Sequence, residues 1–257
     1  MDTGLAGKIA LVPGSTSGIG LAVARSLAAE GARVVVVGRR GDLARTVAAG
    51  LPDAVGVEAD LLDADDLERL VSTVTDDLGR VDVLVLNGGG PAPGRAEDMT
   101  PSAARDAVDR LLVPHVRLVE AFLPGMRERG WGRVVAVASS GVQEPIQALA
   151  ASNVGRAALA GFLKSLAADV ARDGVTVNMV LPGRIDTDRV ASLDAGSADA
   201  TGRSVADVRA ASEASIPVGR YGRPDEFAAV VTFLASEIAG YVTGEQVRCD
   251  GGAVRHY

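Results

Sequence analysis

Apolar positions along the chain fall into short β-rich runs that alternate with longer amphipathic stretches. The short runs are rich in Val and bounded by Gly, Asp or Pro, which predicts strands buried on both faces. They cover residues 9–12, 33–37, 55–58, 83–86, 133–138, 176–180 and 245–249. Between them lie stretches of helical length, the main ones at residues 22–30, 65–78, 101–128, 150–172 and 225–236. Strand alternating with helix predicts an α/β fold with a seven-stranded, parallel, doubly wound sheet and helices on both faces.

The carboxyl ends of the strands in such a sheet form the ligand crevice. Residues 187–215 break the alternation, since they are polar, rich in small residues and poorly periodic. We expect a mobile helical flap over the crevice, at about residues 185–215, rather than a second domain. Residues 1–257 are therefore predicted to form a single domain.

Composition narrows the class of protein. A length of 257 residues with 47% hydrophobic content suffices for one large core, and a net charge of −7 disfavours broad contact with a nucleic-acid backbone. No apolar run approaches a membrane span or a signal sequence, so we expect a cytoplasmic protein without nucleic-acid or membrane partners. Cys249 is the only cysteine, and His115 and His256 are the only histidines, which disfavours a disulfide or a bound metal.

A glycine-rich turn directly follows the first predicted strand and precedes the first helix. It consists of Gly14, Ser15, Thr16, Ser17, Gly18, Ile19 and Gly20. Glycines permit a tight turn and a close approach of the backbone to a pyrophosphate, and the free N–H groups of the following helix favour an anion. The turn predicts a dinucleotide cradle, with a purely structural turn as the alternative.

The end of the second predicted strand bears on the choice of dinucleotide. An acidic residue there would hold the ribose hydroxyls of NAD, whereas this chain has Gly38 followed by Arg39 and Arg40. Guanidinium groups favour a 2′-phosphate, so we expect NADP(H) as the cofactor. Solvated arginines that open a helix are the alternative.

The Gly-x-x-x-Gly-Ile-Gly turn resembles that of the short-chain dehydrogenase/reductase family, and the resemblance extends from Gly7 to Gly252. It implies a Rossmann-like fold and a homotetramer. The chain departs from the family at Pro13, where threonine is usual. Proline lacks both the threonine hydroxyl and the N–H. The sequence therefore leaves open whether this turn is hydrogen-bonded to the loop after the fourth strand.

The resemblance also implies further cofactor contacts. Asp60 and Leu61 are similar to the family's contact to the adenine ring, although Asp60 could equally cap a helix. A loop of the family that lies against the ribose and nicotinamide corresponds to Asn87, Gly88 and Gly89, with a plain loop as the alternative. The family's Pro-Gly loop, whose backbone and threonine hold the nicotinamide amide and the phosphates, corresponds to Pro182, Gly183, Ile185 and Thr187.

The catalytic positions depart from the family, in which a serine is followed thirteen residues later by Tyr-x-x-x-Lys. Ser139 matches the serine, but Ser152 and Arg156 occupy the tyrosine and lysine positions. Leu111 replaces the family's asparagine. A serine hydroxyl is too weakly acidic to replace a phenol, and Arg156 does not readily deprotonate. Ser139, Ser152 and Asn153 still offer donors to a carbonyl, while Arg156 can hold the ribose hydroxyls and stabilise negative charge.

The variant Ser-Asn-x-x-Arg motif resembles a divergent branch of the family that includes ketoreductases of angucycline-type aromatic polyketides. Those enzymes reduce a ring ketone with NADPH. We therefore expect an NADP-dependent oxidoreductase of antibiotic biosynthesis that takes an apolar, polycyclic ketone. A 3-oxoacyl-thioester reductase is the first alternative, and a catalytically silent NADP-binding regulatory protein is the second.

Overall fold

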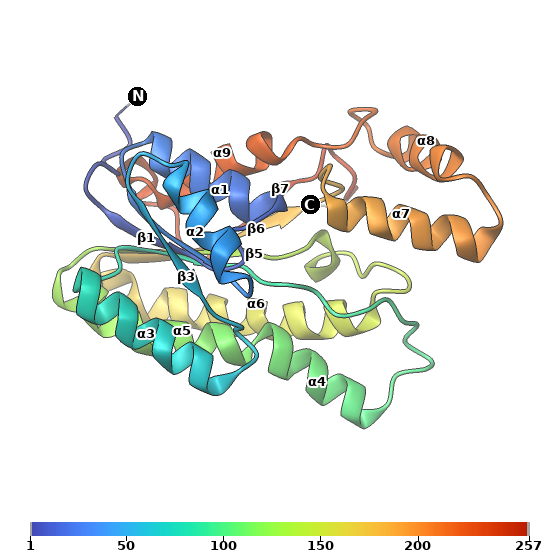
Figure 1. The fold of residues 1–257 in the computed structure, drawn as a ribbon. Coiled ribbons are helices and arrows are strands. Elements are labelled where there is room, and N and C mark those ends of the chain that lie inside the picture. Colours follow the sequence, from blue (N-terminus) through green and yellow to red (C-terminus); the bar gives the residue numbers. More distant parts are fainter. Residues whose placement is uncertain (1, 256–257) are drawn as a thin grey trace.

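The computed structural model describes residues 2–255 and contains one seven-stranded sheet (Figure 1). All its strand pairs are parallel, in the order β3-β2-β1-β4-β5-β6-β7. The strands span Ile9–Val12 (β1), Arg33–Gly38 (β2), Ala54–Glu58 (β3), Val83–Leu86 (β4), Gly132–Val137 (β5), Val175–Pro182 (β6) and Gln246–Cys249 (β7). The chain order reverses between β1 and β4. In doubly wound sheets, the carboxyl ends of the strands at such a point form the ligand crevice. The predicted doubly wound α/β fold is confirmed.

Helices cover both faces of this sheet. Within the described chain they span Gly18–Ala29 (α1), Gly41–Ala49 (α2), Ala64–Leu78 (α3), Pro101–Leu111 (α4), Val113–Glu128 (α5), Ala150–Val170 (α6), Asp188–Thr201 (α7), Val205–Ser215 (α8) and Pro224–Ala235 (α9). Helices α3, α5 and α6 pack on one face, and α1, α2 and α9 pack on the other (Figure 1). Helices α7 and α8 extend from the edge at which the strands end (Figure 1).

Alternate residues of the central strands enter two separate cores. Leu11 and Val35 belong to the core beneath α3, α5 and α6, whereas their neighbours Ala10 and Val34 belong to the core beneath α1, α2 and α9. All four are fully buried. Removal of apolar surface from water stabilises the fold by about 25 cal/mol per Å², so burial on both faces explains the unbroken Val-rich runs.

The segment from residue 101 to 128 differs from the prediction of a single helix. It forms α4 and α5, which meet at Leu112. Pro114 lies in the first turn of α5, where its missing N–H is tolerated, whereas it would interrupt a continuous helix. Helix α2 is missing from the prediction because its nine residues span little more than two turns.

The predicted flap consists of two helices, α7 and α8. Thr187 and Ser204 cap their N-termini, and Gly202 ends α7 with a φ of 65° in the left-handed region. The flap is thus helical as expected, and its mobility stays a prediction. None of the helices in residues 2–255 is long and apolar enough to cross a membrane.

Candidate active site

The glycine-rich turn after β1 brings the backbone close to the crevice. Gly14 and Gly18 have φ angles of 61° and 55°, which favour glycine. A Cβ atom on Gly20 would lie 2.2 Å from the carbonyl oxygen of Gly14, so the start of α1 packs directly on the turn. Ser17 precedes α1 without a side-chain cap, and no acidic residue lies in the first turn of this helix. The first N–H groups of α1 are therefore available to an anion.

Ser15 is the exception within this turn. Its hydroxyl donates to the carbonyl oxygen of Val12 and accepts a 3.1 Å hydrogen bond from the N–H of Val37, and the residue is fully buried. The Ser15 side chain therefore ties the turn to β1 and β2, and a contact of Ser15 with the cofactor stays a prediction. Thr16 packs against β2, since a Cβ atom on Gly38 would lie 2.6 Å from its Cγ2.

Asn87 joins the turn to the loop after β4. Its Nδ2 donates to the carbonyl oxygens of Pro13, at 2.9 Å, and of Gly14, at 3.3 Å. Because backbone carbonyls accept these bonds, the tie does not need the hydroxyl or N–H that proline lacks. Gly88 and Gly89 follow, and a Cβ atom on Gly89 would meet nothing within 4 Å. The loop therefore leaves open space beside the turn.

Arg39 and Arg40 lie at the carboxyl end of β2, where both are exposed. Arg40 occupies the N-cap position of α2 without a side-chain cap. Neither side chain has a hydrogen-bond or ion-pair partner among residues 2–255. Both guanidinium groups are thus able to meet a ligand phosphate at this end of the crevice.

Asp60 and Leu61 lie in the loop between β3 and α3. Asp60 Oδ1 accepts a 3.1 Å hydrogen bond from the N–H of Leu62, whereas Asp63 is the residue that caps α3. The alternative that Asp60 caps the helix is therefore wrong. Leu61 faces the loop after β4, because its Cδ1 lies 4.0 Å from the position of a Cβ atom on Gly88.

The loop after β6 lies beside the glycine-rich turn. Pro182 ends β6, and Gly183 packs so closely on the backbone after β7 that a Cβ atom would not fit. Ile185 is buried, and Thr187 caps α7. The Cγ2 of Thr187 is 3.5 Å from the position of a Cβ atom on Gly18. The fold thus brings together the two loops that the sequence assigns to the cofactor.

Ser139 lies two residues beyond the end of β5. Its Oγ accepts a 3.1 Å hydrogen bond from the N–H of Gly141, which leaves the hydroxyl hydrogen free to donate. Ser152 lies in the first turn of α6, is partly buried and forms no hydrogen bond through its hydroxyl to another described residue. Both predicted serine donors therefore retain a hydrogen for a ligand.

Asn153 holds a loop in place. Its Oδ1 accepts from the N–H of Ile146 at 3.3 Å, and its Nδ2 donates to the Ile146 carbonyl oxygen at 2.9 Å. Oδ1 and the oxygen of Ser139 both lie close to Gly141, so the fold brings these two predicted residues together. Only one amide hydrogen of Asn153 remains for a substrate, which reduces its predicted role as a donor.

Arg156 on α6 and His115 on α5 are two basic residues of the candidate site. Arg156 Nη1 donates to the carbonyl oxygen of Val137 at 2.8 Å. Burial of this guanidinium and the charge of Arg189 lower the pKa of Arg156 to about 10, so it stays cationic at neutral pH. His115 on α5 is buried, and its Nδ1 has no hydrogen-bond partner among the described residues. Burial and the charge of Arg156 lower the pKa of His115 to about 4, so the imidazole is neutral.

The sequence did not point to His115 or Arg189 as residues of this site. His115 follows Leu111 by four residues, a spacing that places two side chains on one helix face, and this spacing was the available signal. Arg189 reaches the site only through tertiary structure, because its Nη2 donates to the carbonyl oxygen of Pro91 at 2.9 Å. His256 lies outside the described residues.

Comparison with known proteins identifies the family of the chain. A family model described as Enoyl-(Acyl carrier protein) reductase matches residues 14–254. The chain belongs to the short-chain dehydrogenase/reductase family.

A candidate ketoacyl reductase of Streptomyces coelicolor is 37% identical, over 95% of this chain and 96% of its own length. The 3-oxoacyl-acyl-carrier-protein reductase FabG of Vibrio harveyi is 35% identical, over 96% and 98%. Among solved structures, a variant of actinorhodin polyketide ketoreductase with NADPH superposes with a TM-score of 0.91 at 35% identity, covering 97% of this chain and 98% of that chain.

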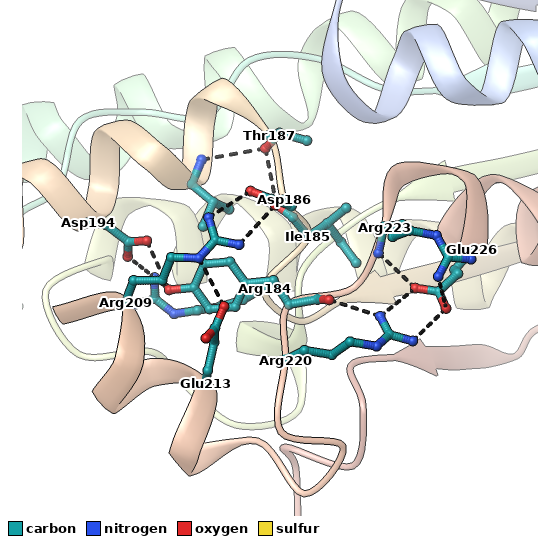
Figure 2. A network of polar contacts seen from close by, with 12 residues as sticks. Arg184, Ile185, Asp186, Thr187, Asp194, Arg209, Glu213, Arg220, Arg223 and Glu226 are labelled. Atoms are coloured by element: carbon teal, nitrogen blue, oxygen red, sulfur yellow. Dashed lines mark hydrogen bonds and ion pairs between the residues drawn. The ribbon is translucent and has the colours of Figure 1, made fainter. Parts of the chain in front are cut away.

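This member of the short-chain dehydrogenase/reductase family fastens its flap with a polar network (Figure 2). The buried carboxylate of Asp194 on α7 accepts hydrogen bonds from Arg184 Nη1, at 2.5 Å, and from the hydroxyl of Tyr221, at 2.9 Å. Arg209 on α8 donates to both carboxylate oxygens of Asp186, at 3.1 and 2.9 Å. Both flap helices are therefore tied to the loop after β6, which carries predicted cofactor residues.

Proposed function

We propose that this chain is an NADPH-dependent ketoreductase that reduces a ring ketone of a polycyclic aromatic polyketide of the angucycline type. One observation carries the proposal: Ser139, whose hydroxyl keeps its hydrogen for a ligand, lies two residues beyond Val137, the end of β5 that Arg156 binds through a 2.8 Å hydrogen bond to its carbonyl oxygen. The relatives support a keto group as the target. Two of them are named for ketoacyl or oxoacyl reduction, and the third is a polyketide ketoreductase.

The residues of the crevice fit NADP(H). The uncapped N-terminus of α1 suits the pyrophosphate, and a side chain at Gly14 would strike Asn87 Nδ2 at 2.9 Å and fill the cradle. Arg39 suits a 2′-phosphate. Thr187, whose hydroxyl donates to the Ile185 carbonyl oxygen at 3.3 Å, packs beside Gly18 of the glycine-rich turn. When bound, NADPH supplies the hydride for the carbonyl carbon.

The protein side chains act on the carbonyl oxygen. Ser139 can donate to it, with Ser152 as a second hydroxyl donor, and the fixed charge of Arg156 stabilises negative charge that develops there. Arg156 keeps its proton at neutral pH, and neither serine is acidic enough to give one up. The oxygen therefore takes its proton from water.

This chain lacks the tyrosine phenol that serves as the family's general acid. Its absence favours a substrate whose reduction depends least on a general acid. A ring ketone conjugated with an aromatic system spreads the negative charge over several atoms as the carbonyl is reduced. Proton delivery is then less demanding than for an isolated ketone. This argument supports a polycyclic aromatic substrate for the site at Ser139.

Two alternatives lead to different measurements. A 3-oxoacyl-thioester reductase is supported by the names of the relatives, but its carrier protein is acidic and this chain has a net charge of −7. A regulatory protein would bind NADPH without turnover, and the loss of the Tyr–Lys pair supports that alternative.

Single-turnover oxidation of NADPH, followed by absorbance, separates these functions. Excess protein is mixed with NADPH and either a conjugated polycyclic ketone or an acetoacetyl thioester. The proposal expects oxidation with the polycyclic ketone and formation of its alcohol. Faster turnover of the thioester would favour the first alternative, and tight NADPH binding without oxidation by either compound would favour the second.

A further inference from the structure

The loop between β5 and α6 presents an apolar side chain beside the predicted donor Ser139. Ile146 lies in this loop, and 37% of its surface is exposed. Its Cγ1 lies 3.5 Å, and the Oγ of Ser139 lies 3.2 Å, from the position that a Cβ atom on Gly141 would take. Ligand pockets combine apolar side chains with a few placed polar groups, and Ser139 and Ile146 together have this composition.

Asn153 holds Ile146 in this place through its backbone. Asn153 Oδ1 accepts a hydrogen bond from the Ile146 N–H at 3.3 Å, and Nδ2 donates to the Ile146 carbonyl oxygen at 2.9 Å. The amide thus pairs with both backbone groups of one residue, as a hydrogen-bonded residue of a neighbouring antiparallel strand would. Two bonds to the same residue fix its orientation as well as its position.

The chain that follows Ile146 is fixed as well. Ala148 has a φ of 58°, in the left-handed region that residues with a Cβ atom rarely adopt. Its carbonyl oxygen accepts a 2.7 Å hydrogen bond from the N–H of Gly94, and the N–H of Ala150 donates to the Gly94 carbonyl oxygen at 3.1 Å. Such a conformation persists only where the surrounding structure holds it. The loop is therefore fixed at Ile146 and again two residues later.

Asn153 is poorly placed to act on the ketone itself. One hydrogen of its Nδ2 is used in the bond to Ile146, and its Oδ1 can only accept. Ser139 and Ser152 retain their hydroxyl hydrogens and already supply donors for the carbonyl oxygen. The two bonds to Ile146 therefore indicate that Asn153 acts through the loop.

We propose that Asn153 is a positioning residue that fixes Ile146 as an apolar contact for the substrate, so that a ring fused to the ketone-bearing ring packs on the Ile146 side chain. The inference rests on the proposed function and names the residues that select its substrate class. A fixed apolar surface favours a rigid, flat ligand, because neither partner loses much conformational freedom on binding. A flexible acyl chain would lose rotational freedom at the same surface.

Ligand affinities of four proteins test the inference: the wild type, Ile146→Ala, Asn153→Ala and the double variant. Each is saturated with NADP⁺, which cannot reduce a ketone, and titrated by calorimetry with two probes. Fluorenone is a tricyclic conjugated ketone, whereas cyclohexenone has a single ring. Ile146→Ala should weaken fluorenone binding about tenfold, as expected for the loss of roughly two buried methylene groups. Asn153→Ala should weaken it about fivefold, because the released loop must be ordered again on binding. Cyclohexenone should bind all four proteins equally.

The double variant distinguishes a positioning residue from one that contacts the ligand. If Asn153 acts through Ile146, Asn153→Ala should cause no further loss of fluorenone affinity once Ile146 is replaced by alanine. Losses that multiply in the double variant would overturn the positioning role. Ile238→Ala is the matched control, since Ile238 is 46% exposed on the 3₁₀ helix Glu237–Ala239 after α9, and its fluorenone affinity should equal that of the wild type.

Hydrogen exchange gives a second measurement that does not depend on a ligand. Asn153→Ala should increase exchange at residues 144–149, while exchange in β5 and β6 stays as in the wild type. Unchanged exchange in this loop would show that Asn153 does not hold it, and would overturn the inference.

The inference and the proposed function can fail separately. Fluorenone that binds the wild type no more tightly than cyclohexenone, or that binds Ile146→Ala as tightly as the wild type, would overturn the inference. Single-turnover oxidation of NADPH tests the proposed function with the same probe. A wild type that binds fluorenone through Ile146 but does not oxidise NADPH would refute the ketoreductase and leave the apolar contact established.

Discussion

At the scale of single residues, three basic side chains determine the charge of the candidate site, and one of them is proposed to select the cofactor. Arg39 is exposed at the end of β2, whereas Arg156 is held beneath the crevice by the Val137 carbonyl. His115 adds a buried imidazole that is neutral at pH 7. These three residues lead to separate predictions, because Arg39 is proposed to contact a ligand phosphate, Arg156 stays charged at neutral pH and His115 resists protonation.

Arg39 is expected to make the protein select NADPH. A charge-assisted contact with the 2′-phosphate should give NADPH at least tenfold tighter binding than NADH, equivalent to about 1.4 kcal/mol. Arg39→Ala should lose this preference, while Arg45→Ala, which removes a nearby arginine already paired with Asp42, should keep it. Fluorescence titration with both cofactors measures the ratio. Equal affinities in the wild type, or an unchanged ratio in Arg39→Ala, would refute the assignment.

His115 is expected to make the fold sensitive to mild acid. Its pKa is lowered from 6.5 to about 4 in the folded protein, so the unfolded chain binds the proton more readily. The stability contributed by the neutral imidazole is complete above pH 6.5 and is lost as the pH falls towards 4, by about 3 kcal/mol. Urea unfolding of the wild type and of His115→Leu at several pH values tests this. The variant should show a shallower pH dependence, and identical slopes would contradict the prediction.

Residues whose roles depend on local pattern were predictable from the sequence, and those whose roles depend on distant partners were not. The positions of the turn glycines and of the arginines after β2 were predictable, because these residues directly follow β1 and β2 in the sequence. The inward orientation of the Ser15 side chain could not be predicted, because its partner Val37 is 22 residues away on the next strand. Arg189 depends on Pro91, 98 residues away. No local pattern encodes such contacts.

At the scale of elements, the two helices of the flap have weak apolar patterns in the sequence. A network of hydrogen bonds and ion pairs holds them against the loop after β6. Few positions of α7 and α8 are buried, so their apolar periodicity is faint and the helices could not be placed from sequence. The paired helices α4 and α5 were merged for the opposite reason, because apolar positions continue through Leu112. The central strands were predictable because both of their faces are buried.

The buried carboxylate of Asp194 is expected to hold α7 against the loop after β6. Asp194→Ala leaves Arg184 and Tyr221 without their shared acceptor, which should cost about 3 kcal/mol locally and increase hydrogen exchange in α7 and α8. Asp199→Ala, at an exposed position of the same helix, is the control. Hydrogen exchange followed by mass spectrometry resolves the flap. Equal protection in both variants would mean that the network does not fasten it.

At the scale of the whole molecule, we propose a cytoplasmic homotetramer, as the family resemblance implies. A groove between α3 and α5 is lined by apolar Leu67, Val71 and Ala121 and by charged residues that include Glu68, Arg117 and Glu120. Val113 and Val154 are exposed on α5 and α6. Such apolar positions on neighbouring helices suit a symmetric interface.

Light scattering tests this assembly directly. Four chains of 26.1 kDa should give a mass of about 104 kDa at micromolar concentration. Val113→Glu and Val154→Glu would place charges on the proposed interface and should shift the mass towards smaller species, whereas Val205→Glu, at an exposed position of the flap, should not. A monomeric wild type would exclude the tetramer.

The central claim is that the substituted site is catalytic in its own way, and single-turnover NADPH oxidation with a conjugated polycyclic ketone tests it most directly. Loss of one preorganised donor should reduce the rate on the order of 100-fold, so Ser139→Ala and Arg156→Ala should both be slow. Ser165→Ala, at an exposed position in the C-terminal half of α6, should react as the wild type does. Restoring the family pair with Ser152→Tyr and Arg156→Lys should not accelerate the reaction, because the phenol would occupy space that the substrate needs. Full activity in Ser139→Ala, or a much faster enzyme with the restored pair, would contradict the account.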